Sequence, residues 1–303
     1  MAATDAHVLI AANPKSGASS GREKTGDLAH RLSAAGFVVD VCDSLPELAT
    51  KSHRLWADQR LRAVVAAGGD GTAAAVVNLI PHGTPMAILP LGTENLLAKQ
   101  FGLVGSAAQT ASAVQNGRIV RLDVGLADGR MFLVMLSCGF DAEVVRQVHA
   151  ARKGHIRRWT YFKPICRAIR NYRYPSIHVR ALSPEPGSDG KPADASFSTA
   201  WFFAFNLPRY AAGLSFCPQA IGDDGLLNLC SFTRGGTVRS IKYFFYLWFR
   251  RHQQLRDFRH DLAKGFHLSS LGEVPYQIDG DPGGFLPLDV EIMPERLTLL
   301  VPK

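Results

Sequence analysis

Short apolar runs alternate with segments of helical periodicity over the first 120 or so residues of the chain. Apolar, β-branched runs predict buried strands, and apolar positions spaced three and four residues apart predict helices. The predicted strands are 7–12, 37–42, 61–67 and 85–89, and the predicted helices are 22–35, 46–60, 73–80 and 96–101. Strands that alternate with helices favour a parallel sheet with right-handed crossovers. We therefore predict an α/β domain over residues 1–122.

The pattern changes after about residue 120, where apolar runs follow one another without regular helices between them. The predicted strands there are 122–126, 131–137, 176–183, 199–206, 226–232, 267–270, 275–278 and 288–292. Closely spaced strands separated by turn-forming residues are typical of an antiparallel sandwich or barrel. We predict a second, β-rich domain over residues 123–296, interrupted by helices near 156–172 and 237–257.

Composition and cysteine usage indicate a globular chain in a reducing compartment. Of the 303 residues, 47% are hydrophobic and 20% are charged, which is ordinary for a folded domain. The first apolar run lacks a basic flank, and no later run approaches the ~20 residues of a membrane-spanning helix. The five cysteines are odd in number and show no Cys-x-x-Cys spacing, which argues against a disulfide framework or a zinc site. We expect a soluble, cytoplasmic protein.

Small, polar and glycine residues follow each of the four predicted N-terminal strands. The most characteristic loop is Gly68-Gly69-Asp70-Gly71-Thr72, which leads from a buried strand into a helix. A helix N-terminus presents backbone N–H groups and a positive dipole end, which suit a phosphate, and Thr72 is predicted to cap this helix. An ordinary turn explains these five residues equally well. Four such loops at the carboxyl ends of parallel strands favour a nucleotide-phosphate site.

Six motifs follow one another along the chain. They are Asn13-Pro14-Lys15-Ser16-Gly17, Gly68-Gly69-Asp70-Gly71-Thr72, Pro90-Leu91-Gly92-Thr93-Glu94-Asn95, Gly139-Phe140, the 218–226 stretch with Asp224-Gly225, and Ile278-Asp279-Gly280-Asp281. In order and spacing the set resembles the diacylglycerol kinase catalytic-domain family, which includes bacterial lipid kinases and the sphingosine and ceramide kinases. The resemblance implies an ATP- and Mg²⁺-dependent phosphotransferase. Its fold is an α/β nucleotide-binding domain and a C-terminal antiparallel β-sandwich, with the active site in the interdomain cleft and residues 297–303 completing the first domain.

The resemblance also implies roles for individual residues. Asp279 matches the carboxylate proposed as general base for the substrate hydroxyl, and Asp70 matches a carboxylate assigned either that role or metal binding. Asp281 is placed to hold a metal or a phosphate. Oxygen ligands at Ile221, Asp224 and Leu226 match a structural magnesium site, as suits a hard cation. The positions that match nucleotide contacts are Asn13, Ser16, Gly17, Ser44, Gly68, Gly69, Gly71, Thr72 and Thr93.

Some of these residues depart from the family pattern or have a plainer explanation. Asp281 stands where the family usually has Glu, Leu96 stands where it often has a carboxylate, and Asp141 stands where many members have a small or neutral residue. These departures leave the acceptor open. Asp279-Gly280 is also strong hairpin-turn chemistry, and Asp224-Gly225 is equally a turn before a strand.

Two basic stretches carry the net charge of +8. Residues 146–180 hold ten Lys and Arg and no acidic residue, and residues 234–259 hold seven against a single Asp. Basic amphipathic helices favour anionic membrane surfaces, whereas a solvated face over a buried stripe is the alternative. On the first predicted helix the basic positions are Lys163, Arg167 and Arg170, and on the second they flank the aromatic run 243–249.

The sequence therefore predicts a cytoplasmic, peripherally membrane-associated lipid kinase that phosphorylates a hydroxyl of diacylglycerol or a related lipid. An NAD kinase is a second reading, because that family resembles this one in fold and in the Gly-Gly-Asp-Gly motif, but the Asn-Glu pair typical of that family does not occur here. A non-catalytic nucleotide- or nucleic-acid-binding regulator is a third, although no recognised nucleic-acid motif is present. We expect a lipid substrate and no nucleic-acid partner, and a homodimer stays open.

Overall fold

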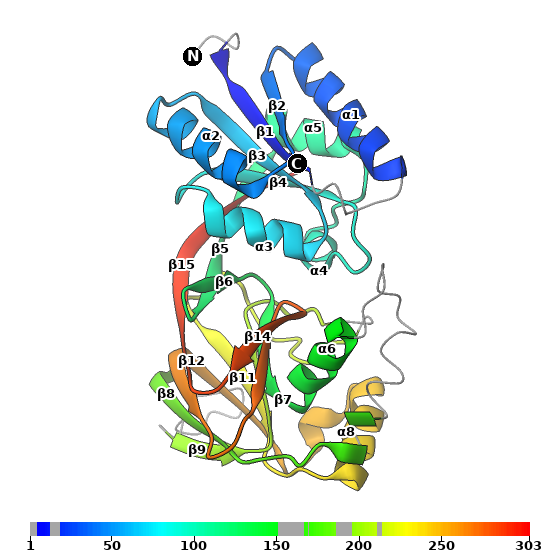
Figure 1. Cartoon of the computed structure of the whole chain (residues 1–303), viewed down its shortest axis with the longest axis vertical. Helices are drawn as coiled ribbons and strands as arrows, with labels where there is room; N and C mark the ends of the chain where they lie inside the picture. The colour runs from blue at the N-terminus through cyan, green and yellow to red at the C-terminus, as the bar shows by residue number, and fades with distance from the viewer. Residues whose placement is uncertain (1–4, 13–18, 151–166, 169, 186–195, 211–213) are drawn as a thin grey trace. The chain divides into compact units, whose positions relative to one another are not determined.

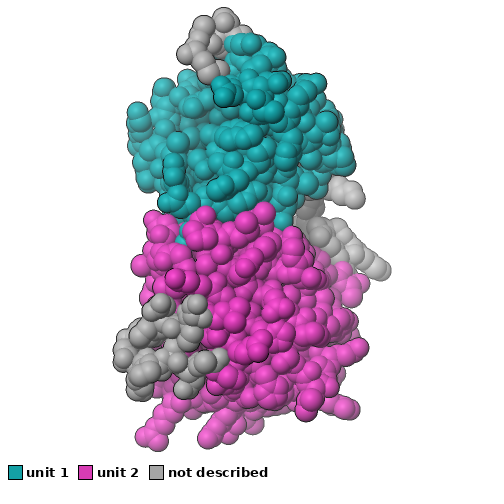
Figure 2. Space-filling model, turned by 90° about the vertical axis from the view of Figure 1, so that its left-hand side faces the viewer, with its two compact units in different colours: residues 1–123, 295–303 teal, residues 124–294 magenta. Residues whose placement is uncertain are grey.

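The computed structural model describes residues 5–12, 19–150, 167–168, 170–185, 196–210 and 214–303 (Figure 1). The chain forms two compact units, residues 1–123 with 295–303, and residues 124–294 (Figure 2). Two strands, β5 (Arg118–Ala127) and β15 (Leu288–Val301), run from one unit into the other. The predicted domain limits, 122 and 297, lie one and two residues from the observed ones.

The first unit is built on a parallel sheet. Its strand order is β15-β4-β3-β1-β2, with β15 joining β4 in parallel through Thr298 and Leu299. The C-terminal segment therefore completes this sheet. The remaining strands are β1 (His7–Ala12), β2 (Val38–Cys42), β3 (Leu61–Gly68) and β4 (Pro85–Pro90).

Helices cover both faces of this sheet (Figure 1). On one face, α1 (Ser19–Ala34) and α5 (Ala107–Asn116) pack on alternate strand residues such as Ile10 and Val65, with Leu28 of α1 and Val114 of α5 in the same core. On the other face lie α2 (Leu45–Ala57) and α3 (Asp70–Leu79). The strands read as continuous apolar runs because both faces are buried.

The second unit is the antiparallel β-sandwich. Its strand order is β14-β13-β7-β10-β11-β12-β15, and β8 pairs with β12 and β9. The strands are β6 (Arg130–Phe132), β7 (Met135–Gly139), β8 (Ile177–Glu185), β9 (Ser196–Thr199), β10 (Trp201–Phe205), β11 (Leu227–Phe232), β12 (Phe258–Ser269), β13 (Pro275–Ile278) and β14 (Asp281–Phe285).

The two faces of strand β10 pack against different parts of this unit. Phe202 and Ala204 lie in an apolar core with residues of the other strands. Trp201 faces the opposite way, where it packs on Phe140 of α6 (Phe140–Ala150) and Tyr243 of α8 (Thr237–Trp248). Because successive side chains of a strand point to opposite faces, β10 contributes to the sandwich core on one face and packs against two helices on the other.

Several predicted elements differ from the structure. The predicted strand 131–137 is two strands, because the N–H groups of Leu133 and Val134 donate to a side-chain carboxylate, that of Asp279, instead of a neighbouring strand. The predicted helix 237–257 ends at Trp248, two residues before Arg250 adopts a left-handed conformation (φ 55°). Helices α5 and α6 were not predicted, and β12 and β15 are longer than predicted.

Most of the first predicted basic helix, including Lys163, lies outside the described residues. Within the described ranges, no helix is both long enough and apolar enough to span a bilayer.

Candidate active site

The first glycine loop connects β3 to α3. The Gly68 backbone is covered by the Thr72 side chain, since a Cβ atom at residue 68 would lie 2.2 Å from Thr72 Oγ1. Gly69, and not Thr72 as predicted, is the N-cap of α3, because its carbonyl accepts the first helical bonds, from Thr72 N (3.0 Å) and Ala73 N (3.1 Å). The N–H groups of Asp70 and Gly71 precede these bonds and point out of the N-terminal end of the helix.

The second glycine loop follows β4 and leads into α4 (Leu96–Gln100). Asn95 closes this loop on Gly92, whose N–H donates to Asn95 Oδ1 (3.0 Å) and whose carbonyl accepts from Asn95 Nδ2 (2.7 Å). Asn95 has φ 50°, which Asn tolerates better than most residues. The two loops touch at their glycines, because a Cβ atom at Gly92 would lie 2.5 Å from Gly69 Cα.

Asp70 ties the first loop to the second. Its carboxylate accepts from Leu96 N (2.9 Å) and Leu97 N (3.1 Å), the first N–H groups of α4. Burial raises the pKa of Asp70, and these two backbone bonds oppose the shift. The carboxylate predicted to be catalytic or metal-binding is therefore engaged as a cap between the loops, and its catalytic role stays a prediction.

The other predicted nucleotide contacts in this unit are less constrained. Ser44 is the N-cap of α2, with its Oγ accepting from Glu47 N (3.4 Å), and the residue is exposed. Thr93 and Gly71 are exposed in the two glycine loops. The remaining predicted contacts, Asn13, Ser16 and Gly17, lie outside the described residues.

In the second unit, Asp279 occupies a tight hairpin turn between β13 and β14. Asp279 and Gly280 have φ 50° and φ 89°, and Ile278 pairs with Asp281 across the turn. Both central residues of a type I′ turn need positive φ, so the turn chemistry seen in the sequence is real.

The side chain of Asp279 also makes contacts that a plain turn does not need. Its Oδ2 accepts from Leu133 N (2.7 Å), and its Oδ1 accepts from Val134 N and Met135 N (both 2.9 Å). Asp279 N donates in turn to Met135 O (3.0 Å). Three backbone donors hold this carboxylate in one orientation, and charge-assisted bonds of this kind are about twice as strong as neutral ones.

Asp281, two residues further along, is more loosely held. Its carboxylate lies 3.5 Å from Arg130 Nη2 and 3.6 Å from His149 Nε2, at or beyond the limit of hydrogen bonding. The side chain is 44% exposed. Its oxygens are thus accessible and only weakly committed to cationic neighbours.

A buried polar network lies behind the Asp279 turn. The Asp141 carboxylate accepts from Ser137 Oγ, Tyr210 Oη and Gln277 Nε2 (3.3 Å), and burial raises its pKa. The Gln277 amide continues to the turn, where its Oε1 accepts from Gly280 N (2.7 Å). From the sequence, Asp141 stood out only as a departure from the family pattern, and Gln277 was not predicted. Its signal was a lone Gln inside the apolar strand β13.

The predicted magnesium loop is a turn before β11. Asp224 Oδ1 accepts from Leu226 N (3.0 Å), and Gly225 has φ 72°. Asp224 and Ile221 are exposed. The turn is therefore observed, and magnesium binding at Ile221, Asp224 and Leu226 stays a prediction, as does the placement of an active site between the two domains.

The fold and these loops match known families. Residues 7–127 match the model of the diacylglycerol kinase catalytic domain, and residues 134–301 match that of the YegS C-terminal NAD kinase beta sandwich-like domain. The chain belongs to the diacylglycerol kinase catalytic-domain family. The two matches together account for both units of the structure.

Several proteins similar to this chain are named diacylglycerol kinases. A diacylglycerol kinase of Mycobacterium tuberculosis is 27% identical over 80% of this chain and 77% of its own length. One from Staphylococcus saprophyticus is 22% identical over 96% of this chain and 93% of its own. A crystal structure of a diacylglycerol kinase from Bacillus anthracis superposes with a TM-score of 0.69 over 98% of this chain and 97% of that one, at 21% identity, which shows the shared fold.

Proposed function

We propose that this family member is an ATP- and Mg²⁺-dependent lipid kinase that transfers a γ-phosphoryl group to a hydroxyl of diacylglycerol or a related sphingoid or glycerolipid. The observation that carries the proposal is the contact between the two glycine loops, where a Cβ atom at Gly92 would clash with the Gly69 backbone (2.5 Å) and one at Gly69 would contact Gly92 tightly (3.2 Å). Paired loops at the carboxyl ends of neighbouring parallel strands suit a polyphosphate, because their N–H groups approach it without steric hindrance.

The first unit supplies the nucleotide site in this proposal. The N–H groups of Asp70 and Gly71 at the start of α3 act as phosphate donors, and Asn95 keeps the second loop closed beside them. Asp70 contributes by positioning, since it fixes α4 against the first loop. A side chain in place of Gly92 pushes the loops apart and displaces these donors together.

The second unit supplies the acceptor side. Asp279 receives the hydrogen bond of the lipid hydroxyl and orients it, with its own carboxylate held by three backbone N–H groups. Phosphoryl transfer is catalysed largely by positioning and electrostatics, so a rigid carboxylate serves it well. The accessible oxygens of Asp281 fit a hard cation, and Mg²⁺, when bound, supplies positive charge that offsets the charge on the phosphoryl group.

The test is ATP consumption by the purified chain with diacylglycerol, a sphingoid base, NAD or no acceptor. We expect a phosphorylated lipid as product. Gly92→Ala is expected to lower kcat/KM for ATP by about 100-fold, because a misplacement of about 1 Å costs that much. Gly26→Ala in α1 is the matched control, because a Cβ atom there meets nothing within 4 Å. Phosphorylation of NAD alone, or equal activity of the two variants, contradicts the proposal.

We further propose that α8 docks the enzyme on an anionic membrane, where a lipid acceptor resides. Ser240, Tyr243 and Leu247 bury one face of α8. The other face is exposed, and its apolar side chains lie at helical spacing and continue past the end of the helix: Val238, Ile241, Phe245, Trp248 and Phe249, with exposures of 81%, 58%, 62%, 73% and 56%.

The charge around this face matches an anionic surface. Residues 234–256 hold six Lys and Arg and no Asp or Glu. Lys242, Arg250 and Arg251 are exposed beside the apolar face. Each basic residue near an anionic bilayer contributes about 1 kcal/mol, and each large apolar side chain that enters the interface contributes about 1.5–3 kcal/mol. The structure thus favours the membrane interpretation over a solvated face on a buried stripe.

Vesicle sedimentation tests this docking surface. We expect binding to phosphatidylserine-containing vesicles that weakens with salt. Trp248→Glu is expected to lower the partition coefficient at least about 10-fold, from the burial contribution of one large side chain. Leu271→Glu is the control, because Leu271 is fully exposed (103%) but lies in the turn between β12 and β13. Equal partitioning of the two variants, or equal binding to neutral vesicles, refutes α8 as the anchor.

A further inference from the structure

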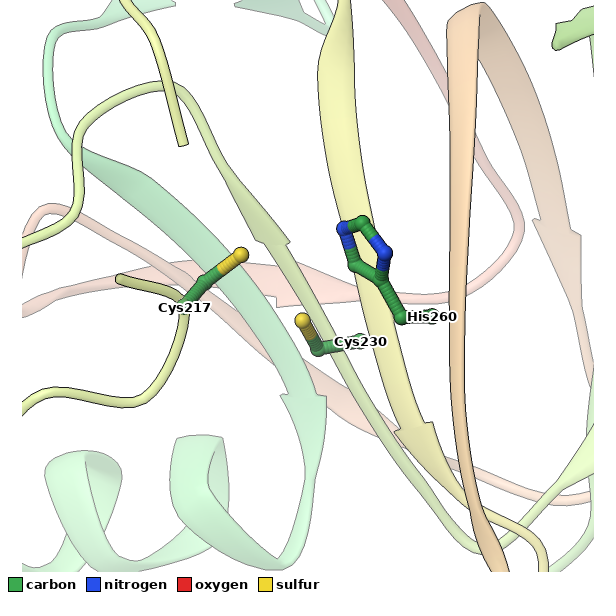
Figure 3. Close-up of side chains that lie close together, drawn as sticks. All are labelled: Cys217, Cys230 and His260. Carbon is green, nitrogen blue, oxygen red and sulfur yellow. The ribbon is translucent and has the colours of Figure 1, made fainter. Parts of the chain in front are cut away.

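Two cysteines and a histidine from separate segments meet inside the second unit. Figure 3 shows Cys217 from the loop before β11, Cys230 on β11 and His260 on β12. Their ligating atoms, two Sγ and one ring nitrogen, all lie within 4.8 Å of one another. Both cysteines are completely buried, and His260 is partly buried.

Strand register and a loop produce this meeting. Cys230 and His260 are directly paired residues of the antiparallel strands β11 and β12, so their side chains lie on the same face of the sheet. Cys217 is brought to them by the preceding loop, where its carbonyl accepts from Ala220 N (3.2 Å) and the neighbouring Phe216 carbonyl lies 2.7 Å from His252 Nε2. The strand pairing therefore fixes Cys230 and His260, and hydrogen bonds of the loop backbone fix Cys217.

A fourth polar residue orients the imidazole. Asn228 is buried one strand repeat before Cys230, and its Oδ1 lies 2.9 Å from His260 Nε2. Metal-ligating histidines are normally fixed by an oxygen atom beside the ring. The cysteines also interact with one another: burial raises the pKa of Cys230, and a hydrogen bond from its thiol, with His260 nearby, lowers the pKa of Cys217.

We propose that Cys217, Cys230 and His260 bind a zinc ion in the β-sandwich and supply three of its usual four ligands. Zn²⁺ binds sulfur at about 2.3 Å and imidazole nitrogen at about 2.0 Å, so in a tetrahedral site these ligand atoms lie about 3.5–3.8 Å apart. The observed cluster, whose ligand atoms lie within 4.8 Å of one another, therefore needs to close by at most about 1 Å. Two thiolates neutralise the charge of Zn²⁺, which reduces the desolvation free energy of burying the metal site. Thiolate and imidazole ligands select zinc over the hard cation of the proposed kinase chemistry.

Burial argues for a metal over a redox function. Reactive cysteines are partly exposed so that an oxidant or a partner thiol can reach them, whereas Cys217 and Cys230 have no exposed surface. The four described cysteines, Cys42, Cys138, Cys217 and Cys230, are all free. None of the three ligands is a residue assigned to phosphoryl transfer, although Cys217 lies in the same loop before β11 as the predicted magnesium positions Ile221, Asp224 and Leu226.

The experiment measures zinc in the full-length chain. Protein incubated with excess Zn²⁺ and desalted is expected to retain about one equivalent, as a structural site does. Cys230→Ala and His260→Gln are each expected to lower zinc affinity by more than about 100-fold, since a lost ligand costs more than a lost second-shell partner. Cys138→Ala is the matched control, because Cys138 is an equally buried cysteine on strand β7 of the same unit.

A second measurement separates zinc loss from misfolding. Co²⁺ added to the wild-type chain is expected to show thiolate-to-metal charge-transfer absorption, and Zn²⁺ is expected to raise the Tm of wild type and Cys138→Ala but not of His260→Gln. Absence of retained zinc in the wild type, equal retention by all three variants, or a Cys217–Cys230 disulfide in place of the metal overturns the proposal. None of these outcomes depends on kinase activity, so failure here is distinct from failure of the proposed function.

Discussion

Asp279→Asn replaces one carboxylate oxygen by an amide nitrogen and leaves the shape of the hairpin turn intact. Asn tolerates the left-handed conformation that Asp279 adopts (φ 50°), so the turn itself loses little. The substitution weakens or removes the hydrogen bonds from three backbone N–H groups, those of Leu133, Val134 and Met135. These residues are buried, so water cannot replace a lost acceptor.

The contacts set the size of the effect. The amide oxygen of Asn can still accept from Val134 N and Met135 N, but each bond loses its charge assistance, about 1 kcal/mol apiece. Leu133 N then faces the amide nitrogen and loses its acceptor, which costs about 1–3 kcal/mol. The sum predicts that Asp279→Asn lowers the free energy of unfolding by about 3–5 kcal/mol, in addition to any loss of catalysis.

Urea unfolding, followed by tryptophan fluorescence, measures this loss in the free energy of unfolding. With a slope of about 2 kcal/mol per M, the unfolding midpoint of Asp279→Asn is expected to fall by more than about 1 M. Asp281 lies on the same hairpin and has only long, partly exposed ion pairs, so the free energy of unfolding of Asp281→Asn is expected to stay within about 0.5 kcal/mol of wild type. If Asp279→Asn unfolds at the wild-type midpoint, the three backbone bonds do not anchor the turn, and the reasoning fails.

Two further predictions concern the other buried carboxylates. Asp70→Asn removes one of the two side-chain oxygens that accept from the backbone N–H groups of α4 and is expected to cost about 1–2 kcal/mol of stability, less than Asp279→Asn, while raising the KM for ATP. A lowered kcat with unchanged KM and stability would instead indicate direct catalysis. The folded pKa of Asp141 lies above the ordinary 3.8, so the folded state takes up a proton more readily than the unfolded chain. This stabilising contribution is fully present below pH 3.8 and is lost as pH rises through the folded pKa. The Tm of wild type relative to Asp141→Asn is therefore expected to fall as pH rises from about 4 to 7, and a pH-independent difference contradicts the burial of this charge.

The sequence predicted the first unit more completely than the second. Strands β1 and β3 were located almost to the residue, because a strand buried on both faces is a continuous apolar run that needs no knowledge of its neighbours. In the sandwich, the segment 131–137 looked like one strand, since its apolar character is unbroken. Only the carboxylate of Asp279, some 145 residues later, divides it into β6 and β7.

In the candidate site, too, the local motifs could be predicted from the sequence, whereas the contacts between them could not. The glycine motifs at 68–72 and 90–95 were visible in the sequence, because turns and helix starts depend on local residue types. The contact between Gly69 and Gly92 was not, since it depends on the pairing of β3 with β4. The structure adds a second role for Asp70 for the same reason: as a local motif it is a candidate catalytic carboxylate, and in the fold it also caps a helix that begins 26 residues later.

Sequence alone determined the family, the division into an α/β unit and a β-rich unit, and the loops that carry the expected chemistry, because each of these is encoded by residues close together in the chain. Tertiary structure decided which distant side chains meet. It joined Asp279 to the segment 133–135, and it brought Cys217 and Cys230 to His260, although their spacing in the sequence argued against a zinc site. The register of antiparallel strands sets such meetings, and register depends on the packing of the whole sheet.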